Sequence, residues 1–212
     1  MGNRNLGING PSIAALGYGA MVLEGFYGRS NDEQGITTIV EAMNRSQAGT
    51  VFHLASTPFN PANLPARLHL QVNVTGMFNV LEELRKLPES RLVYTGTAAV
   101  YGEGTNLRED LPMRPTTIVG ATKGAATMLL QTYSRVHGVN GIELRLFAPY
   151  GPWEHSRRLI PHVVLSALEK HDIPITEGIQ QRDFVFIDDV VQAMVLASNK
   201  THRPGTVLNI GY

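Results

Sequence analysis

Apolar segments of two periods alternate along most of this 212-residue chain, and that alternation limits the folds open to it. Between residues 70 and 84 the apolar side chains recur at helical spacing, which predicts an amphipathic helix: Leu70, Val74, Met77, Phe78, Leu81 and Leu84. Residues 120–137 and 159–170 predict further helices, and the runs at 50–56, 142–147 and 207–211 predict strands. Another strand, followed by a loop, is predicted within 91–102. This alternation favours right-handed crossovers, so the sequence predicts an α/β fold with a doubly wound parallel sheet.

Composition excludes several kinds of partner. Hydrophobic residues make up 43% of the chain, which is enough for one sizeable core. Eighteen Lys and Arg residues balance 18 Asp and Glu residues, so we expect neither nucleic acid nor a membrane as a partner. There is no cysteine and no secretion signal at the start, which favours a cytoplasmic protein that binds a small molecule or another protein.

Three segments carry the chemistry. The first is a buried strand that ends in small hydroxyl and glycine residues, Val93-Tyr94-Thr95-Gly96-Thr97, and continues to Val100-Tyr101-Gly102. The second is Ile118-Val119-Gly120-Ala121-Thr122-Lys123, and the third is a strand that runs into a helix, Arg182-Asp183-Phe184-Val185-Phe186-Ile187-Asp188-Asp189. In this order and spacing they resemble the extended short-chain dehydrogenase/reductases, the NAD-dependent nucleotide-sugar epimerase and dehydratase family. The resemblance runs from about Val51 to Gly211 and implies a Rossmann-like sheet.

The resemblance implies a catalytic set of tyrosine, lysine and a serine or threonine. Thr97 matches the hydroxyl that bonds the reacting oxygen, and Lys123 matches the lysine that holds the cofactor ribose. Val119 stands at the tyrosine position, and its side chain has no proton to exchange. Loss of a positioned acid or base typically costs about 10²–10⁴ in rate, so the sequence predicts impaired catalysis.

Other site residues follow from the same resemblance. Ala55, Thr95, Lys123 and Tyr150 are implied to bind the cofactor, NAD or NADP. Thr97, Ala148 and Arg182 are implied to bind a nucleotide sugar or related hydroxyl substrate, although relatives commonly carry asparagine where Ala148 stands. The family commonly dimerises through a helix pair, here the helices around Met77 and Met128, so we expect a homodimer. The histidines show no close ligand pair, and we expect no metal.

The family's glycine-rich phosphate turn has no match. Gly7–Gly10 and Gly17–Gly19 are rich in glycine but do not connect a strand to a helix, as the fingerprint requires. The sequence therefore predicts a partial sheet that lacks the usual first strands and this turn.

The first 50 residues follow another pattern. Leu6-Gly7-Ile8-Asn9-Gly10 and Leu16-Gly17-Tyr18-Gly19 resemble the opening hairpin and first strand of an aldo-keto reductase, and Ile36, Ile39, Val40 and Met43 follow an Asn31-Asp32 cap at helical spacing. We therefore predict an aldo-keto-reductase-like segment over 1–50 and an epimerase-like domain over 51–212. A divergent epimerase could also supply the helix before the join.

Structural readings compete with functional ones at several positions. Arg182 and Asp183 could tie a strand end rather than bind phosphate, and Asp188 with Asp189 favours a helix N-cap over acid catalysis. His53 is expected to pack at a strand end. For the whole chain, the alternative to an impaired enzyme is a catalytically inactive binding or interaction protein of the same fold. An aldo-keto reductase is a third possibility, but its catalytic tetrad is missing.

Overall fold

The centre of the molecule is a parallel sheet of four strands. The computed structural model describes residues 3–5, 12–14, 49–57, 64–173 and 177–211. Within them β3 (Thr50–His53), β4 (Arg91–Thr97), β5 (Asn140–Leu146) and β8 (Thr206–Ile210) lie in the order β3-β4-β5-β8. Every neighbouring pair is parallel. The predicted α/β fold with a parallel sheet is confirmed.

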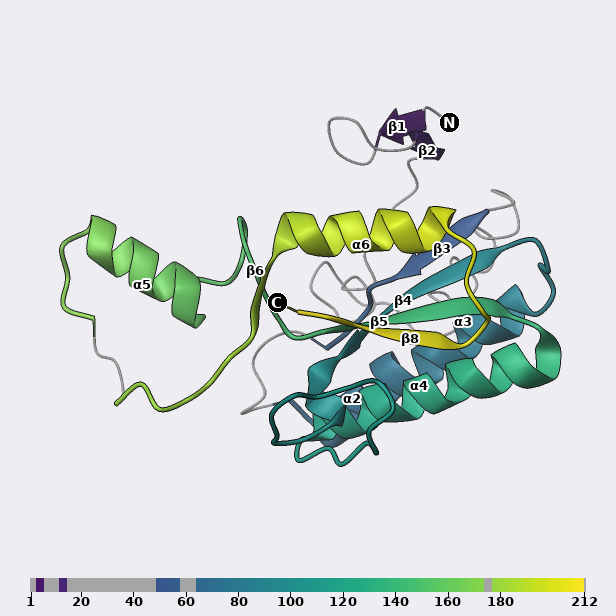
Figure 1. The fold of residues 1–212 in the computed structure, drawn as a ribbon, viewed down its shortest axis with the longest axis horizontal. Helices are drawn as coiled ribbons and strands as arrows, with labels where there is room; N and C mark the ends of the chain where they lie inside the picture. The colour runs from purple at the N-terminus through teal and green to yellow at the C-terminus, as the bar shows by residue number, and fades with distance from the viewer. Residues whose placement is uncertain (1–2, 6–11, 15–48, 58–63, 174–176, 212) are drawn as a thin grey trace.

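Helices cover both faces of this sheet (Figure 1). One face carries a continuous helical stretch, α2 (Ala66–His69), η3 (Leu70–Thr75) and α3 (Gly76–Leu84), together with α4 (Ile118–His137). The other face carries α6 (Ile187–Asn199). The predicted helices over 70–84 and 120–137 are confirmed, but η3 is a π-helix, a form in which each turn holds an extra residue.

Each face of the sheet has its own apolar core. Leu92 and Tyr94 of β4 pack with Met77, Leu81 and Leu130 under α3 and α4. Val93 of β4 and Ile142 and Leu144 of β5 pack with Val190 and Met194 under α6. Successive strand residues alternate between these two cores, as expected for a strand that is buried on both faces.

The start of α4 is fixed by its cap and by a close approach to the loop after β4. The Thr117 side chain accepts a hydrogen bond from Gly120 N at 3.0 Å, which satisfies one of the free donors of the first turn. A Cβ on Gly120 would lie 2.5 Å from Ala99 O, so only glycine allows the helix to come this near. Ala99 belongs to η4 (Ala98–Val100), the turn that follows Thr97. The residues after Gly120 are thereby held beside the end of β4.

A second, smaller sheet lies outside the central one. In it β6 (Ala148–Tyr150) pairs in parallel with β7 (Phe184–Phe186), and α5 (Leu159–Leu168) lies in the connection between them. The predicted helix over 159–170 and the strand before α6 are present. The predicted N-cap at Asp188 and Asp189 is wrong, because Phe186 is the N-cap residue and both aspartates lie in the first turn. There their negative charges interact favourably with the positive end of the helix dipole.

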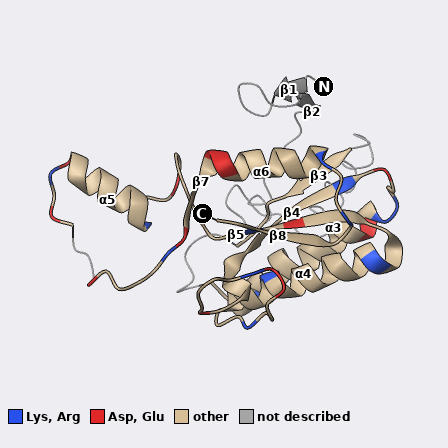
Figure 2. Cartoon of the chain, viewed as in Figure 1, with Lys and Arg blue, Asp and Glu red and all other residues tan. Residues whose placement is uncertain are grey.

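The amino-terminal segment is described only in part. β1 (Asn3–Asn5) and β2 (Ser12–Ala14) form an antiparallel pair, in agreement with the predicted opening hairpin. The predicted helix behind Asn31-Asp32, the glycines at 7–10 and 17–19 and the boundary near residue 50 lie wholly or mostly outside the described residues. Among the described residues no helix is both long and apolar enough to cross a bilayer. Basic and acidic residues are interspersed over the described chain (Figure 2).

Candidate active site

Lys123 is the centre of the candidate site. It lies in the second turn of α4 with only 4% of its surface exposed. Its Nζ donates to Ala55 O at 3.1 Å and to Thr95 O at 3.0 Å. The structure therefore brings together three of the four residues predicted to bind the cofactor, at the carboxyl ends of β3 and β4. Open parallel sheets bind their ligands at this edge.

Burial sets the charge state of this cluster. It lowers the pKa of Lys123 to about 8, so the amine is still mostly protonated at neutral pH. The Nζ of a protonated lysine has three N–H groups, and two of them are used by the carbonyls. Burial, with a smaller contribution from the charge on Lys123, lowers the pKa of His53 to about 3. His53 is therefore neutral; it stacks on Tyr94 with ring centroids 5.6 Å apart, and its buried position agrees with the prediction.

Val119 lies one helical turn before Lys123, on the same face of α4. Its side chain is partly buried and carries no group that titrates. Thr97 ends β4, and its hydroxyl oxygen accepts a hydrogen bond from Ala99 N at 3.2 Å. A hydroxyl that accepts through its oxygen keeps its own proton to donate. The site thus holds the Thr97 hydroxyl and the Lys123 ammonium. The aliphatic side chain of Val119 stands where the motif calls for a tyrosine.

The remaining predicted residues gather on the smaller sheet. Ala148 N donates to Asp183 O at 2.9 Å, which places the exposed Arg182 segment beside Ala148. Tyr150 contacts the rings of Phe184 and Phe186, at centroid distances of 6.1 and 5.4 Å. Tyr150 also lines a hollow of about 370 Å³ with Asn209 and Gly211 at the carboxyl end of β8. Ala148, Tyr150 and Arg182 thus form a second group, apart from the bonds of Lys123.

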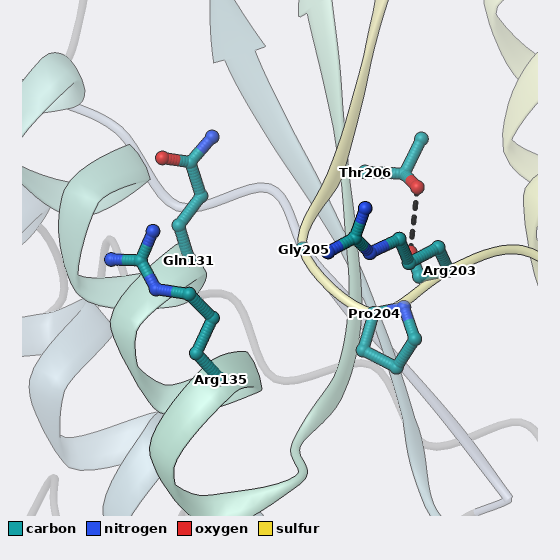
Figure 3. Close-up of a pocket in the computed structure, with 6 residues that line it drawn as sticks. All are labelled: Gln131, Arg135, Arg203, Pro204, Gly205 and Thr206. Carbon is teal, nitrogen blue, oxygen red and sulfur yellow. Dashed lines mark hydrogen bonds between the residues drawn. The ribbon is translucent and has the colours of Figure 1, made fainter.

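Another hollow, of about 310 Å³, lies at the opposite end of the sheet. Figure 3 shows Gln131 and Arg135 of α4 facing the turn Arg203–Thr206 that leads into β8. Gly205 N in this turn donates to Gly141 O near the start of β5. Because Lys123 lies at the carboxyl ends of the strands, this hollow is not part of the candidate site.

Two buried polar features escaped prediction from the sequence. Asn73 of η3 is 1% exposed and donates from Nδ2 to Thr122 Oγ1 at 3.0 Å, while its Oδ1 has no partner within the part of the chain that the structure describes. The second feature is an ion pair between Glu143 and Arg145 on β5. Asn73 interrupts the apolar stripe of its helix, and that interruption was a signal in the sequence. A buried acceptor without a donor is expected to find a water or a ligand.

Comparison with known proteins identifies the family. The family model of the NAD dependent epimerase/dehydratase family matches residues 27–211. The chain belongs to this family. The match begins upstream of Val51, where the resemblance was expected to start. Among curated epimerase/dehydratase relatives, the UDP-glucuronate 4-epimerase of Thermodesulfobacterium geofontis is 31% identical over 166 residues, which is 76% of this chain and 50% of that protein.

Solved structures of the epimerase/dehydratase family agree in fold. The dTDP-glucose 4,6-dehydratase of Bacillus anthracis, in complex with NAD, has a TM-score of 0.75 and 25% identity over 87% of this chain and 58% of that one. MoeE5, in complex with UDP-glucuronic acid and NAD, has a TM-score of 0.73 and 30% identity over 82% of this chain and 59% of that one. The chain spans about half the length of curated relatives that it matches.

Proposed function

We propose that this protein binds NAD or NADP and a nucleotide sugar at the Lys123 site, and that Val119 impairs its turnover. The observation that carries the proposal is the buried Lys123 ammonium, which two backbone carbonyls hold at the carboxyl edge of the sheet, 4.9 Å from the centre of the Tyr94 ring. Relatives with solved structures bind NAD and UDP-glucuronic acid, which supports the same ligand classes here.

The described residues fit the ribose end of such a cofactor. The remaining N–H of Lys123 can donate to a ribose hydroxyl, and Ala55 and Thr95 supply backbone near it. When bound, the nicotinamide would accept a hydride from the sugar and return it. Lys123 would orient the ribose, and the Thr97 hydroxyl would bond the reacting oxygen of the sugar. Val119 can neither take the proton from that oxygen nor return it.

Calorimetry with NAD⁺ and UDP-glucuronic acid tests the binding proposal. Because the sequence has no match to the phosphate turn, we expect weak NAD⁺ binding. The Kd should lie in the millimolar range, which corresponds to a binding free energy of about −4 kcal/mol. Lys123→Ala should abolish it, and Lys86→Ala, at an exposed lysine, should leave it unchanged. Micromolar binding of NAD⁺ would contradict the predicted loss of the phosphate turn, and no binding of either ligand at millimolar concentration would contradict the proposed function.

A second function, a catalytically inactive interaction protein, is favoured by one observation in particular. Val119 removes the proton donor while the fold is kept, and α3 and α4 expose apolar side chains, Phe78 at 44% and Met128 at 55%. Such a protein needs no cofactor. This alternative would be favoured if neither NAD⁺ nor UDP-glucuronic acid binds in calorimetry and the stability of the folded chain depends on a partner.

A further inference from the structure

Glu143 and Arg145 form an ion pair inside the protein, between the sheet and α4. Their side chains are 0% and 3% exposed, and Arg145 Nε lies 3.1 Å from Glu143 Oε1. Ile142 and Leu144, which alternate with them on β5, pack under α6, so Glu143 and Arg145 face α4. A buried pair of charges is often no more stable than apolar side chains of similar volume. Its presence in the core therefore calls for a role other than stability.

Two routes connect Glu143 to Lys123. Along β4, the carboxylate lies against Gly96, the residue that follows the Thr95 carbonyl to which Lys123 donates. Along α4, the Thr127 hydroxyl lies close enough to Glu143 to lower the pKa of its carboxyl group, and it donates to Lys123 O at 3.1 Å. Glu143 thus lies against the residue that follows the Thr95 acceptor, and beside a side chain that is bonded to the backbone of Lys123.

The space that Glu143 fills exists because residue 96 is glycine. A Cβ at this position would overlap Glu143 Oε1 and would lie 2.8 Å from its Cδ and 2.9 Å from its Cγ. Any other residue at position 96 would need the carboxylate or the strand to move. Gly96 and Glu143 therefore act as a matched pair under the Lys123 site.

The charges around this carboxylate come from each element packed against it. Lys123 lies on α4, Arg145 beside it on β5, and Tyr94 on β4, while the neutral His53 lies on β3 beyond Tyr94. Burial raises the pKa of Glu143, and the Arg145 guanidinium, the Thr127 hydroxyl and Lys123 oppose that rise. In the opposite direction, Glu143 counteracts the lowering of the Lys123 pKa by burial. Among the described residues, Glu143 Oε2 has no hydrogen-bond partner.

We propose that Glu143 is a positioning residue of the cofactor site, which holds Lys123 charged and in place under the Ala55 and Thr95 carbonyls. The proposal rests on the proposed function of Lys123 as the ribose ligand. Arg145, the ion-pair partner of Glu143, is in turn fixed by Tyr101, whose hydroxyl accepts a hydrogen bond from Arg145 Nη1 at 2.7 Å. These bonds hold the Glu143 carboxylate in one position. A fixed position is needed if its charge is to act on the Lys123 amine.

The test is a pH titration of lysine side chains by NMR, on the whole chain labelled with ¹³C-lysine and without any nucleotide. The other lysines, Lys86, Lys170 and Lys200, are exposed, and Lys123→Arg assigns the buried one. The buried amine should titrate near 8 in the wild type. In Glu143→Gln its midpoint should fall by roughly one pH unit, the effect of one nearby buried charge. Glu89→Gln, at an exposed carboxylate, should leave it unchanged.

A second variant keeps the test possible if Glu143→Gln does not fold. Glu143→Gln leaves a buried guanidinium without its charged partner, whereas Glu143→Leu with Arg145→Leu removes both charges. The double variant should also lower the Lys123 midpoint, but by less than Glu143→Gln, because the positive charge of Arg145 is removed as well. An unchanged midpoint in either folded variant would overturn the proposal, even if NAD⁺ binds as expected. Conversely, a lowered midpoint in a protein that binds no nucleotide would refute the proposed function of Lys123 and leave the electrostatic coupling standing.

Discussion

Gly96→Ala is expected to destabilise the protein through a single side chain, Glu143. The added methyl would overlap the carboxylate and would lie 2.8 Å from Glu143 Cδ. Glu143 is 0% exposed and cannot turn into solvent. Either β4 moves or the carboxylate leaves Arg145, with which it now pairs at 3.1 Å.

The size of the destabilisation depends on which of these two changes occurs. Overpacking of a core costs about 1–3 kcal/mol, and a broken buried ion pair costs about 3–5 kcal/mol. The protein will take the cheaper route, so we expect Gly96→Ala to lower the free energy of unfolding by roughly 2 kcal/mol. With Glu143→Ala and Arg145→Leu already in place, the obstacle is gone. The same Gly96→Ala change should then be neutral or stabilising by up to about 1 kcal/mol, because it restricts the unfolded chain.

Urea unfolding of the four proteins in this cycle measures the coupling directly. The interaction energy between position 96 and the ion pair should be about 2–3 kcal/mol. Gly49→Ala is the matched control, since a Cβ at Gly49 meets no atom of the described residues within 4 Å. Equal costs of Gly96→Ala in both backgrounds would refute the steric argument, and with it the matched pair under the Lys123 site.

Two further predictions concern stability towards acid and assembly. His53 titrates near pH 3 when folded and near 6.5 when unfolded, so its contribution to stability is complete above pH 6.5 and is lost as the pH falls towards 3. From pH 7 to pH 5 the wild type should lose about 2 kcal/mol more than His53→Phe in urea unfolding, and an equal loss would contradict the buried neutral ring. By light scattering we expect a homodimer, which Met128→Glu should weaken because Met128 is 55% exposed; a stable monomer that binds no hydrophobic dye would count against it.

The sequence predicted the sheet because its signals are local. The apolar runs at 50–56 and 142–147 and the helical stripe before β4 each contain their own period, and the structure places strands and helices there. The dimer face formed by the helices around Met77 and Met128 stays a prediction. Met77 belongs to the same helical stripe as Phe78 but is 0% exposed, so it lies in the core and cannot line a dimer face. A stripe shows that a helix is amphipathic, but its edges depend on what packs against it.

The candidate site was predictable only where the resemblance supplied it. Ala55, Thr95 and Lys123 were named from the family motifs, and the structure joins them by hydrogen bonds. Glu143 and Arg145 were missed because they alternate with apolar residues in a run that predicts an ordinary buried strand. Two charges in a strand covered on both faces need internal partners, and this was the available signal. The room that Gly96 leaves for Glu143 comes from a different strand, which no local pattern can reveal.

The most direct test of the impaired-site account is the conversion of UDP-glucuronic acid to its epimerised or dehydrated product at high NAD⁺, followed by NMR, for the wild type, Val119→Tyr and Lys123→Ala. The account predicts that wild-type turnover is no greater than that of Lys123→Ala. It also predicts that Val119→Tyr gains far less than the roughly 10²–10⁴-fold of a restored acid/base group, because a weakly held cofactor is poorly positioned. Wild-type turnover that Lys123→Ala abolishes would contradict it, and another group, such as Tyr150 or a bound water, would then have to carry the proton.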